Sequence, residues 1–77
     1  MYGKAIKTLM KQNLIDTTYE LSEEIGMART PLQAIIDDKT TKPHRATIKK
    51  LAKFFGLSVI ELKMLAKKEI EQGEGNV

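Results

Sequence analysis

The stretch that decides the fold runs from Thr17 to Lys39 and reads TTYELSEEIGMARTPLQAIIDDK. Its first part has the spacing of a short amphipathic helix whose inner face is Leu21, Ser22 and Ile25. Gly26 follows, and glycine enters the left-handed conformation that ends a helix at little energetic cost. The pattern therefore predicts a short helix that ends in a tight turn.

A second amphipathic helix is predicted after the turn. It begins between Ala28 and Thr30, because Pro31 is best tolerated in a first helical turn. It ends near Asp37. Its apolar stripe consists of Leu32, Ile35 and Ile36. Its opposite side carries Arg29, Thr30, Gln33 and Asp37. Two helices of this kind around a tight turn are typical of a unit that packs on a core and enters a DNA groove.

One helix is predicted before this stretch and two after it. Apolar spacing predicts a helix over residues 3–13, one that Pro43 opens and Gly56 ends, and one over residues 59–71. Their apolar stripes are Ile6, Leu9, Met10 and Leu14; then Ile48, Leu51, Ala52 and Phe55; then Val59, Leu62 and Leu65 or Ala66.

Two capping boxes mark helix starts in this pattern. Thr17 with Glu20, and Ser58 with Glu61, have the spacing at which a hydroxyl and a carboxylate satisfy two backbone N–H groups reciprocally. No segment alternates as a strand does. The expected fold is all-α, a single five-helix domain over residues 1–72 with a disordered tail, GEGNV, over residues 73–77.

The composition restricts the class of protein. A hydrophobic fraction of 42% with 30% charged residues favours a folded chain over a disordered one. The absence of cysteine excludes disulfides and thiolate metal sites and fits a reducing cytoplasm, and the single histidine, His44, cannot build a metal site. No apolar run reaches the roughly 20 residues of a membrane helix. We expect a soluble cytoplasmic protein with no cofactor and no membrane partner.

Positive charge is concentrated in residues 39–53. This segment contains no acid and six cations, Lys39, Lys42, Arg45, Lys49, Lys50 and Lys53, in a chain of net charge +3. A one-sided basic surface suits a polyanion such as DNA. The alternative is a solvated lysine-rich helix face, since Lys49, Lys50 and Lys53 cannot all face one duplex.

The chain resembles the lambda repressor/Cro-type (XRE-like) helix-turn-helix DNA-binding domains from about Ile6 to Leu65. The best-matched residues are Leu21 with the small residue after it, Ile25, Gly26 and Met27, Leu32, Ile35 and Ile36, Pro43, Leu51, Ala52 and Lys53, and Gly56, Leu57, Ser58 and Leu62. The resemblance implies a compact five-helix domain whose third helix enters the major groove. It also implies a small phage-type transcriptional regulator or repressor, usually a dimer on a two-fold symmetric operator in double-stranded DNA.

The resemblance carries functional roles over to particular positions. The positions that read base edges are Arg29, Thr30 and Gln33, and the positions that touch phosphates are Thr17, Thr18, Lys39, Thr40 and Thr41. Lys42 and Arg45 flank the reading helix and would add phosphate affinity, with a phosphate contact also open to His44. Arginine can read guanine and glutamine can read adenine in a bidentate manner.

Each base-reading role has a structural alternative. Arg29 could pair on the surface with Asp37 or with a glutamate of the preceding helix, and Gln33 could simply face solvent. Thr30 has three candidate roles: it caps its helix, touches a phosphate, or contacts a thymine methyl group.

Four departures from the family pattern are visible. Ala28 replaces the usual serine cap, and Asp38 stands where glycine is frequent. Met10 and Ile36 occupy the places of a common arginine–glutamate pair, so we predict an apolar contact between them. Asp37 and Asp38 put negative charge close to the expected phosphate, which weakens DNA binding.

Apolar residues outside the core stripe of the last helix indicate a dimer interface. Ile60 and Met64 lie off its core stripe, at positions i and i+4, and the family often dimerises through this helix. With Phe54 they form the predicted interface of a homodimer. The alternative is that this helix packs only on the first helix.

An enzyme is not expected. The chain has no cysteine nucleophile and no glycine-rich phosphate loop, and its neighbouring carboxylates, such as Glu23 and Glu24, point in different directions on a helix. The alternative function is a protein-interaction module of the same fold, such as a phage modulator, an anti-repressor or an antitoxin. Such a module would act by binding a partner repressor or toxin.

Overall fold

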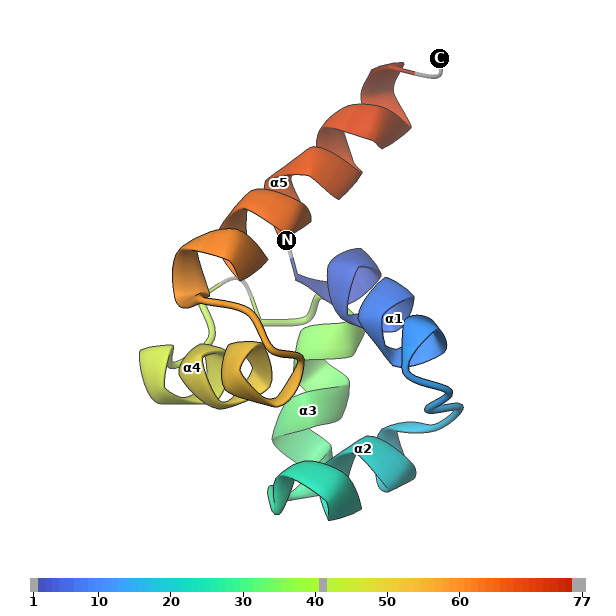
Figure 1. Ribbon diagram of the computed structural model, residues 1–77, viewed down its shortest axis with the longest axis vertical. Coiled ribbons are helices and arrows are strands. Elements are labelled where there is room, and N and C mark those ends of the chain that lie inside the picture. Colours follow the sequence, from blue (N-terminus) through green and yellow to red (C-terminus); the bar gives the residue numbers. More distant parts are fainter. Residues whose placement is uncertain (1, 41, 76–77) are drawn as a thin grey trace.

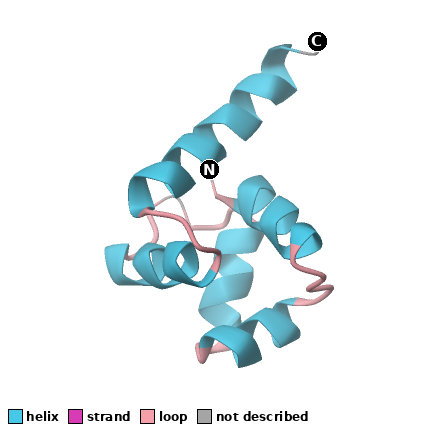
Figure 2. Ribbon diagram, viewed as in Figure 1, coloured by secondary structure: helices cyan, strands magenta, loops and turns pink. Residues whose placement is uncertain are grey.

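The computed structural model describes residues 2–40 and 42–75, with side chains described as far as Lys68. These residues form five helices and no strand: α1 (Gly3–Gln12), α2 (Thr18–Ile25), α3 (Arg29–Ile36), α4 (Arg45–Phe54) and α5 (Val59–Gly75) (Figures 1 and 2). α1 packs on α3 and α5, while α4 packs on α2 and α5. The predicted all-α, five-helix fold is confirmed.

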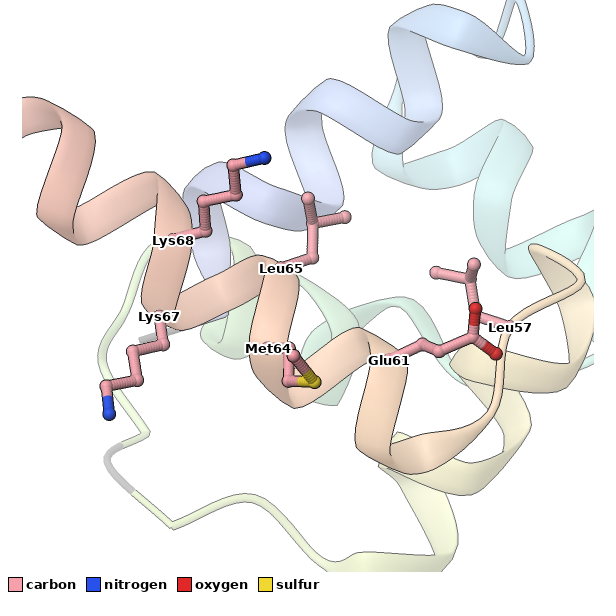
Figure 3. Close-up of a pocket in the computed structure, with 6 residues that line it drawn as sticks. All are labelled: Leu57, Glu61, Met64, Leu65, Lys67 and Lys68. Carbon is pink, nitrogen blue, oxygen red and sulfur yellow. The ribbon is translucent and has the colours of Figure 1, made fainter.

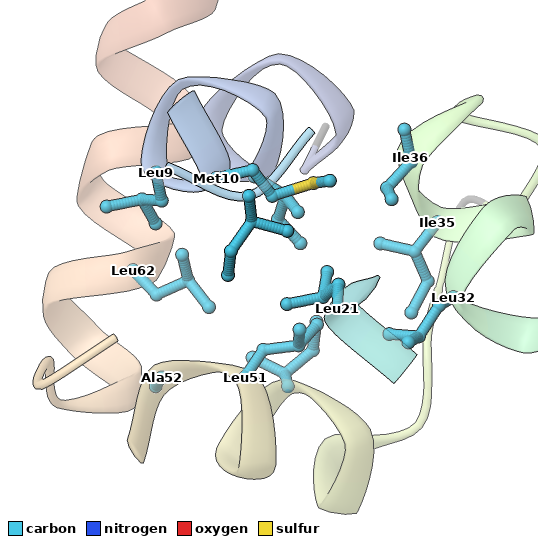
Figure 4. Close-up of a cluster of buried hydrophobic side chains, with 12 residues drawn as sticks. Leu9, Met10, Leu21, Leu32, Ile35, Ile36, Leu51, Ala52 and Leu62 are labelled. Carbon is cyan, nitrogen blue, oxygen red and sulfur yellow. The ribbon is translucent and has the colours of Figure 1, made fainter. Parts of the chain in front are cut away.

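The core receives one fully buried large side chain from each helix. These side chains are Ile6, Leu21, Leu32, Leu51 and Leu62, in helix order. They belong to one apolar cluster that also holds Leu9, Met10, Ile35, Ile36 and Ala52 (Figure 4). Burying a side chain of this size stabilises the fold by about 1.5–3 kcal/mol. All five helices are therefore fixed by the same core.

The first four helices end in the same hydrogen-bonded motif. In each, one residue adopts a positive φ, and the next backbone N–H donates to a carbonyl oxygen five residues back, the arrangement of the Schellman motif. The positive-φ residues are Leu14, Gly26, Asp38 and Gly56. The two glycine stops were predicted, and Asp38 stands at the position after α3 where the resemblance implied a glycine, whereas the leucine stop was not predicted.

Leu14 corrects one part of the sequence interpretation. It was predicted to belong to the apolar stripe of α1, but its φ is 58° and its side chain is 86% exposed. The left-handed residue turns the chain, and the buried side chain is that of Ile15, whose N–H donates to the Met10 carbonyl at 2.8 Å. Helical periodicity fails here because the helix has already ended at Gln12.

The capping boxes are formed to different extents. The Ser58 N–H donates to Glu61 Oε1 at 3.0 Å, and the Glu61 N–H donates to Ser58 Oγ at 3.0 Å, so both bonds of this box are present. At α2 the Glu20 N–H donates to Thr17 Oγ1 at 3.1 Å, which is one of the two expected bonds. Thr17 and Ser58 each stand directly before the first residue of the helix that was predicted from them.

The N-terminus of α1 is capped from a distant part of the chain. The Gly3 N–H donates to Asp38 Oδ1 at 2.9 Å, and the local N-cap residue, Tyr2, supplies no side-chain bond. A Cβ atom at Gly3 would clash with the Ile36 carbonyl oxygen. Asp38 therefore joins the start of α1 to the end of α3, a structural role that the sequence interpretation missed.

An apolar contact was predicted between the same two helices, at Met10 and Ile36. Both residues are buried in one cluster and line one surface hollow together. These two apolar residues stand where the resemblance implied a charged pair.

Two helix boundaries differ from prediction. α4 begins at Arg45, with His44 as its N-cap, so Pro43 precedes the helix and does not open it. α5 continues to Gly75, so residues 73–75 are helical where a disordered tail was expected. Once a helix is nucleated, each added residue contributes one more hydrogen bond, which favours continuation. Asn76 and Val77 lie outside the described residues, and the domain boundary at residue 72 stays a prediction.

Candidate nucleic-acid interface

α3 has one buried face and one exposed face. Leu32, Ile35 and Ile36 point into the core, as predicted (Figure 4). Arg29, Thr30, Gln33 and Asp37 are exposed. α2 packs against α3 and crosses near its N-terminal end (Figure 1). The structure thus presents the three predicted base-reading residues together on the outer side of one helix.

The start of α3 settles one of the roles considered for Thr30. The N-cap residue is Ala28, which makes no side-chain capping bond, and Thr30 lies inside the helix as its second residue. Thr30 therefore does not cap the helix. Pro31 is the third residue and has no N–H, so one donor that a capping side chain normally satisfies does not exist here. This explains why alanine is tolerated at the cap.

Gln33 is held by a neighbour one turn further along α3. Gln33 Nε2 donates to Asp37 Oδ1 at 3.0 Å, and both side chains are exposed. Asp37 was expected to oppose DNA binding through its charge or to pair with Arg29. Its carboxylate contacts the amide of Gln33, the predicted adenine reader.

Arg29 lies in a small polar cluster with α2. A hydrogen bond to the Glu23 carboxylate, together with the negative charge of Glu23, raises the pKa of the Tyr19 phenol, and the positive charge of Arg29 acts in the opposite direction. Tyr19 is 57% exposed. The sequence interpretation missed Tyr19, although an aromatic residue outside the apolar stripe of a short helix was a visible signal.

The two threonines predicted to touch phosphates stand at the start of α2. Thr17 is exposed and is the N-cap, and its hydroxyl oxygen accepts from the Glu20 N–H. Its hydroxyl hydrogen can still donate, because an alcohol is both a donor and an acceptor. Thr18 is half-buried as the first residue of α2.

The predicted phosphate contacts after α3 lie in the connection to α4. Lys39, Lys42, His44 and Arg45 are exposed and Thr40 is half-buried, whereas Thr41 lies outside the described residues. Lys42 and Arg45 line one surface hollow with Tyr2 and with Lys63 of α5. Lys63 is a further cation that sequence reasoning missed, because only helix packing brings it beside residues about 20 positions earlier.

The predicted dimer residues do not all line the same hollow. Ile60 and Met64 are 70% and 65% exposed on α5. Met64 lines an open apolar hollow with Leu57, Glu61, Leu65, Lys67 and Lys68 (Figure 3). Phe54 packs edge-to-face on Phe55 and lines a different hollow, between α2 and α4. α5 does pack on α1, as the alternative required, and the Ile60 and Met64 side chains remain largely exposed.

The described part of the chain has neither a metal site nor a membrane-spanning helix. No group of three histidine, cysteine, aspartate or glutamate residues there could hold a metal ion. None of its helices is both long enough and apolar enough to cross a membrane.

Comparison with known protein families decides the class of the domain. A model of the Cro/C1-type HTH DNA-binding domain matches residues 5–68, which cover all of α1 to α4 except two residues and the described side chains of α5. The chain belongs to the Cro/C1-type helix-turn-helix family. This Cro/C1-type domain is therefore a DNA-binding regulator in general terms, of a family that is typically non-enzymatic. No curated protein and no solved structure matched the chain.

Proposed function

We propose that this Cro/C1-type protein is a sequence-specific transcriptional regulator that reads the DNA major groove with α3. The observation that carries the proposal is the division of α3 into two faces. Its apolar residues are buried in the core, and Arg29, Thr30 and Gln33 are exposed side by side. A helix anchored in this way can enter a groove without losing its packing.

Each reading residue has a chemical partner in the groove. Arg29 would donate two hydrogen bonds to guanine O6 and N7, and Gln33 would bond adenine N6 and N7. Thr30, which does not cap the helix, would contact a thymine methyl group or a phosphate. Each good bidentate pair discriminates against a wrong base by about 1–3 kcal/mol.

Phosphate contacts on both sides of α3 would fix the register of the protein on the duplex. Thr17 and Thr18 at the start of α2 would hold one strand, and Lys39, Thr40, Lys42, His44 and Arg45 would hold the backbone near the α3–α4 connection. These contacts supply affinity that is independent of sequence and sensitive to salt.

The proposed assembly is a homodimer through α5. Ile60 and Met64 are large apolar side chains that stay mostly exposed on a helix otherwise packed against the core. A two-fold dimer through this surface would present two α3 helices to successive turns of DNA, about 34 Å apart. Phe54 lies in another hollow, so its contribution is tested separately.

A titration of fluorescently labelled random-sequence duplex DNA at two salt concentrations tests the DNA proposal. The affinity should fall as salt rises, and Lys39→Ala should reduce the slope of log K against log salt by about 1. Arg29→Ala should also weaken binding. Lys53→Ala is the control, because it removes the same charge from an exposed position at the far end of α4.

The alternative function predicts a different result. A protein-interaction module would be folded, as measured by circular dichroism, and yet would not bind the duplex DNA even at low salt. That outcome would overturn the DNA proposal and favour a partner protein, such as a repressor or a toxin, as the target.

A further inference from the structure

The hydrogen bond between Gln33 and Asp37 restricts the way in which Gln33 can present its amide. The two residues are four apart on α3, so their side chains lie on the same face one turn apart. Gln33 Nε2 donates to Asp37 Oδ1 at 3.0 Å. Asp37 is the C-cap of α3, so its backbone is fixed by the end of the helix.

The chemistry of a carboxylate makes this contact directional. An ionised aspartate only accepts hydrogen bonds, so it binds the NH₂ end of the amide and disfavours the carbonyl end. The other amide hydrogen and Oε1 remain outside the contact. Gln33 is thereby oriented with one donor and one acceptor in a fixed order.

This order matches adenine better than guanine. The major-groove edge of adenine offers an acceptor at N7 and a donor at N6, whereas guanine offers acceptors at N7 and O6. With its amide held by Asp37, Gln33 would face guanine O6 with its own carbonyl oxygen, which is repulsive. The negative charge of Asp37 also opposes phosphates equally at every sequence, so it lowers non-specific affinity without reducing discrimination between bases.

We propose that Asp37 is a positioning residue that orients the Gln33 amide and thereby sets an adenine preference at the base pair that Gln33 reads. This inference rests on the proposed DNA-reading function of α3. Asp37 thereby has a specificity role in addition to the repulsion of phosphates by its charge.

The test begins with the full chain and a library of randomised duplex DNA. Selection with the wild-type protein yields an enriched duplex, and Gln33→Ala identifies the base pair at which Gln33 acts. Duplexes that carry each of the four base pairs at that position then give a specificity ratio for every variant. A ratio of dissociation constants cancels any uniform change in phosphate affinity.

Three variants separate positioning from charge. Asp37→Asn keeps the shape of the side chain but can either accept from or donate to Gln33, so the adenine-to-guanine ratio should fall from about tenfold or more to about twofold. Asp37→Glu keeps an acceptor-only group and should recover most of the ratio. Asp16→Asn removes one exposed negative charge elsewhere and should leave the ratio unchanged.

The NMR chemical shifts of side-chain amides report on the Gln33–Asp37 hydrogen bond without DNA. The Gln33 Nε2 protons should shift in Asp37→Asn and stay near their wild-type positions in Asp37→Glu and Asp16→Asn. Equal ratios and unchanged resonances in Asp37→Asn, from a wild-type protein that does enrich a sequence, would overturn this inference alone. Absence of any enriched sequence with the wild-type protein would overturn the proposed function and this inference together.

Discussion

At the residue scale, Asp38 both adopts a left-handed backbone conformation and caps a helix with its side chain, two roles that different residues usually fill. Its φ is 56°, a region that glycine adopts freely and aspartate adopts less easily. Its carboxylate also accepts the Gly3 N–H and so caps α1. Glycine would satisfy the backbone but could not cap the helix.

Substitutions at Asp38 should separate these two demands. Asp38→Asn keeps an acceptor and tolerates a positive φ, so the free energy of unfolding should change little. Asp38→Ala loses both properties and should cost about 1–2 kcal/mol. Asp38→Gly should fall between them, because it relieves the backbone and loses the cap. Urea unfolding gives these free energies, and equal values for the alanine and asparagine variants would contradict the capping role.

At the element scale, α1 to α4 show that the end of a helix is a property of backbone geometry more than of one residue type. The same Schellman hydrogen bond closes all four helices, with 2.8 Å for Ile15 N to Met10 O and 2.8 Å for Leu57 N to Ala52 O. Gly56 ends α4 with no conformational cost, whereas Leu14 ends α1 at a cost of about 1–2 kcal/mol.

A substitution at the end of α1 should therefore stabilise the protein even though it removes a large apolar side chain. Leu14 is 86% exposed, so Leu14→Asn loses little burial and gains a residue suited to a positive φ. The free energy of unfolding should rise by about 0.5 kcal/mol or more. Leu14→Ala is the control, because alanine keeps the Cβ that causes the strain. If urea unfolding shows that Leu14→Asn is destabilised, the Leu14 side chain makes a stabilising contact in solution and the prediction is wrong.

At the scale of the whole molecule, the exposed apolar residues of α5 are connected to the proposed DNA binding by α3 through dimerisation. If Ile60 and Met64 form the proposed two-fold interface, Met64→Lys places two like charges face to face and should convert the dimer to a monomer. Sedimentation equilibrium measures the change in mass. DNA affinity for a two-fold symmetric duplex should fall together with dimerisation, since each monomer would then bind one half-site alone.

Two control variants are measured beside Met64→Lys. Lys67→Glu changes the charge of a neighbouring exposed residue of α5 and should leave more dimer than Met64→Lys. Phe54→Ala should leave the dimer intact if its separate hollow is outside the interface. A wild-type protein that is monomeric at all measured concentrations would contradict the α5 interface.

Much of the fold follows from signals within a few residues along the chain. The bonds of the Ser58 and Glu61 capping box, the stops at Gly26 and Gly56, and the buried stripes apart from Leu14 could be predicted. Each depends on neighbours three to five positions away, which helical geometry brings together in any context. The exposure of Arg29, Thr30 and Gln33 was predicted for the same reason, as the polar side of one amphipathic helix, whereas their base-reading role was implied by the family resemblance.

The tertiary structure decided the features that need two separate elements. The Gly3 N–H meets Asp38 across a separation of 35 residues, and Lys63 joins Lys42 and Arg45 only because α5 folds back beside the α3–α4 connection. Ile15 replaced Leu14 in the core because the chain turned after Gln12. The sequence by itself thus determined the helices and their polar and apolar faces, since these depend on local hydrogen bonds and helical periodicity. Which polar groups of different helices meet was decided by the packing of the helices, because partners distant in the chain are brought within hydrogen-bond distance only by the shared core.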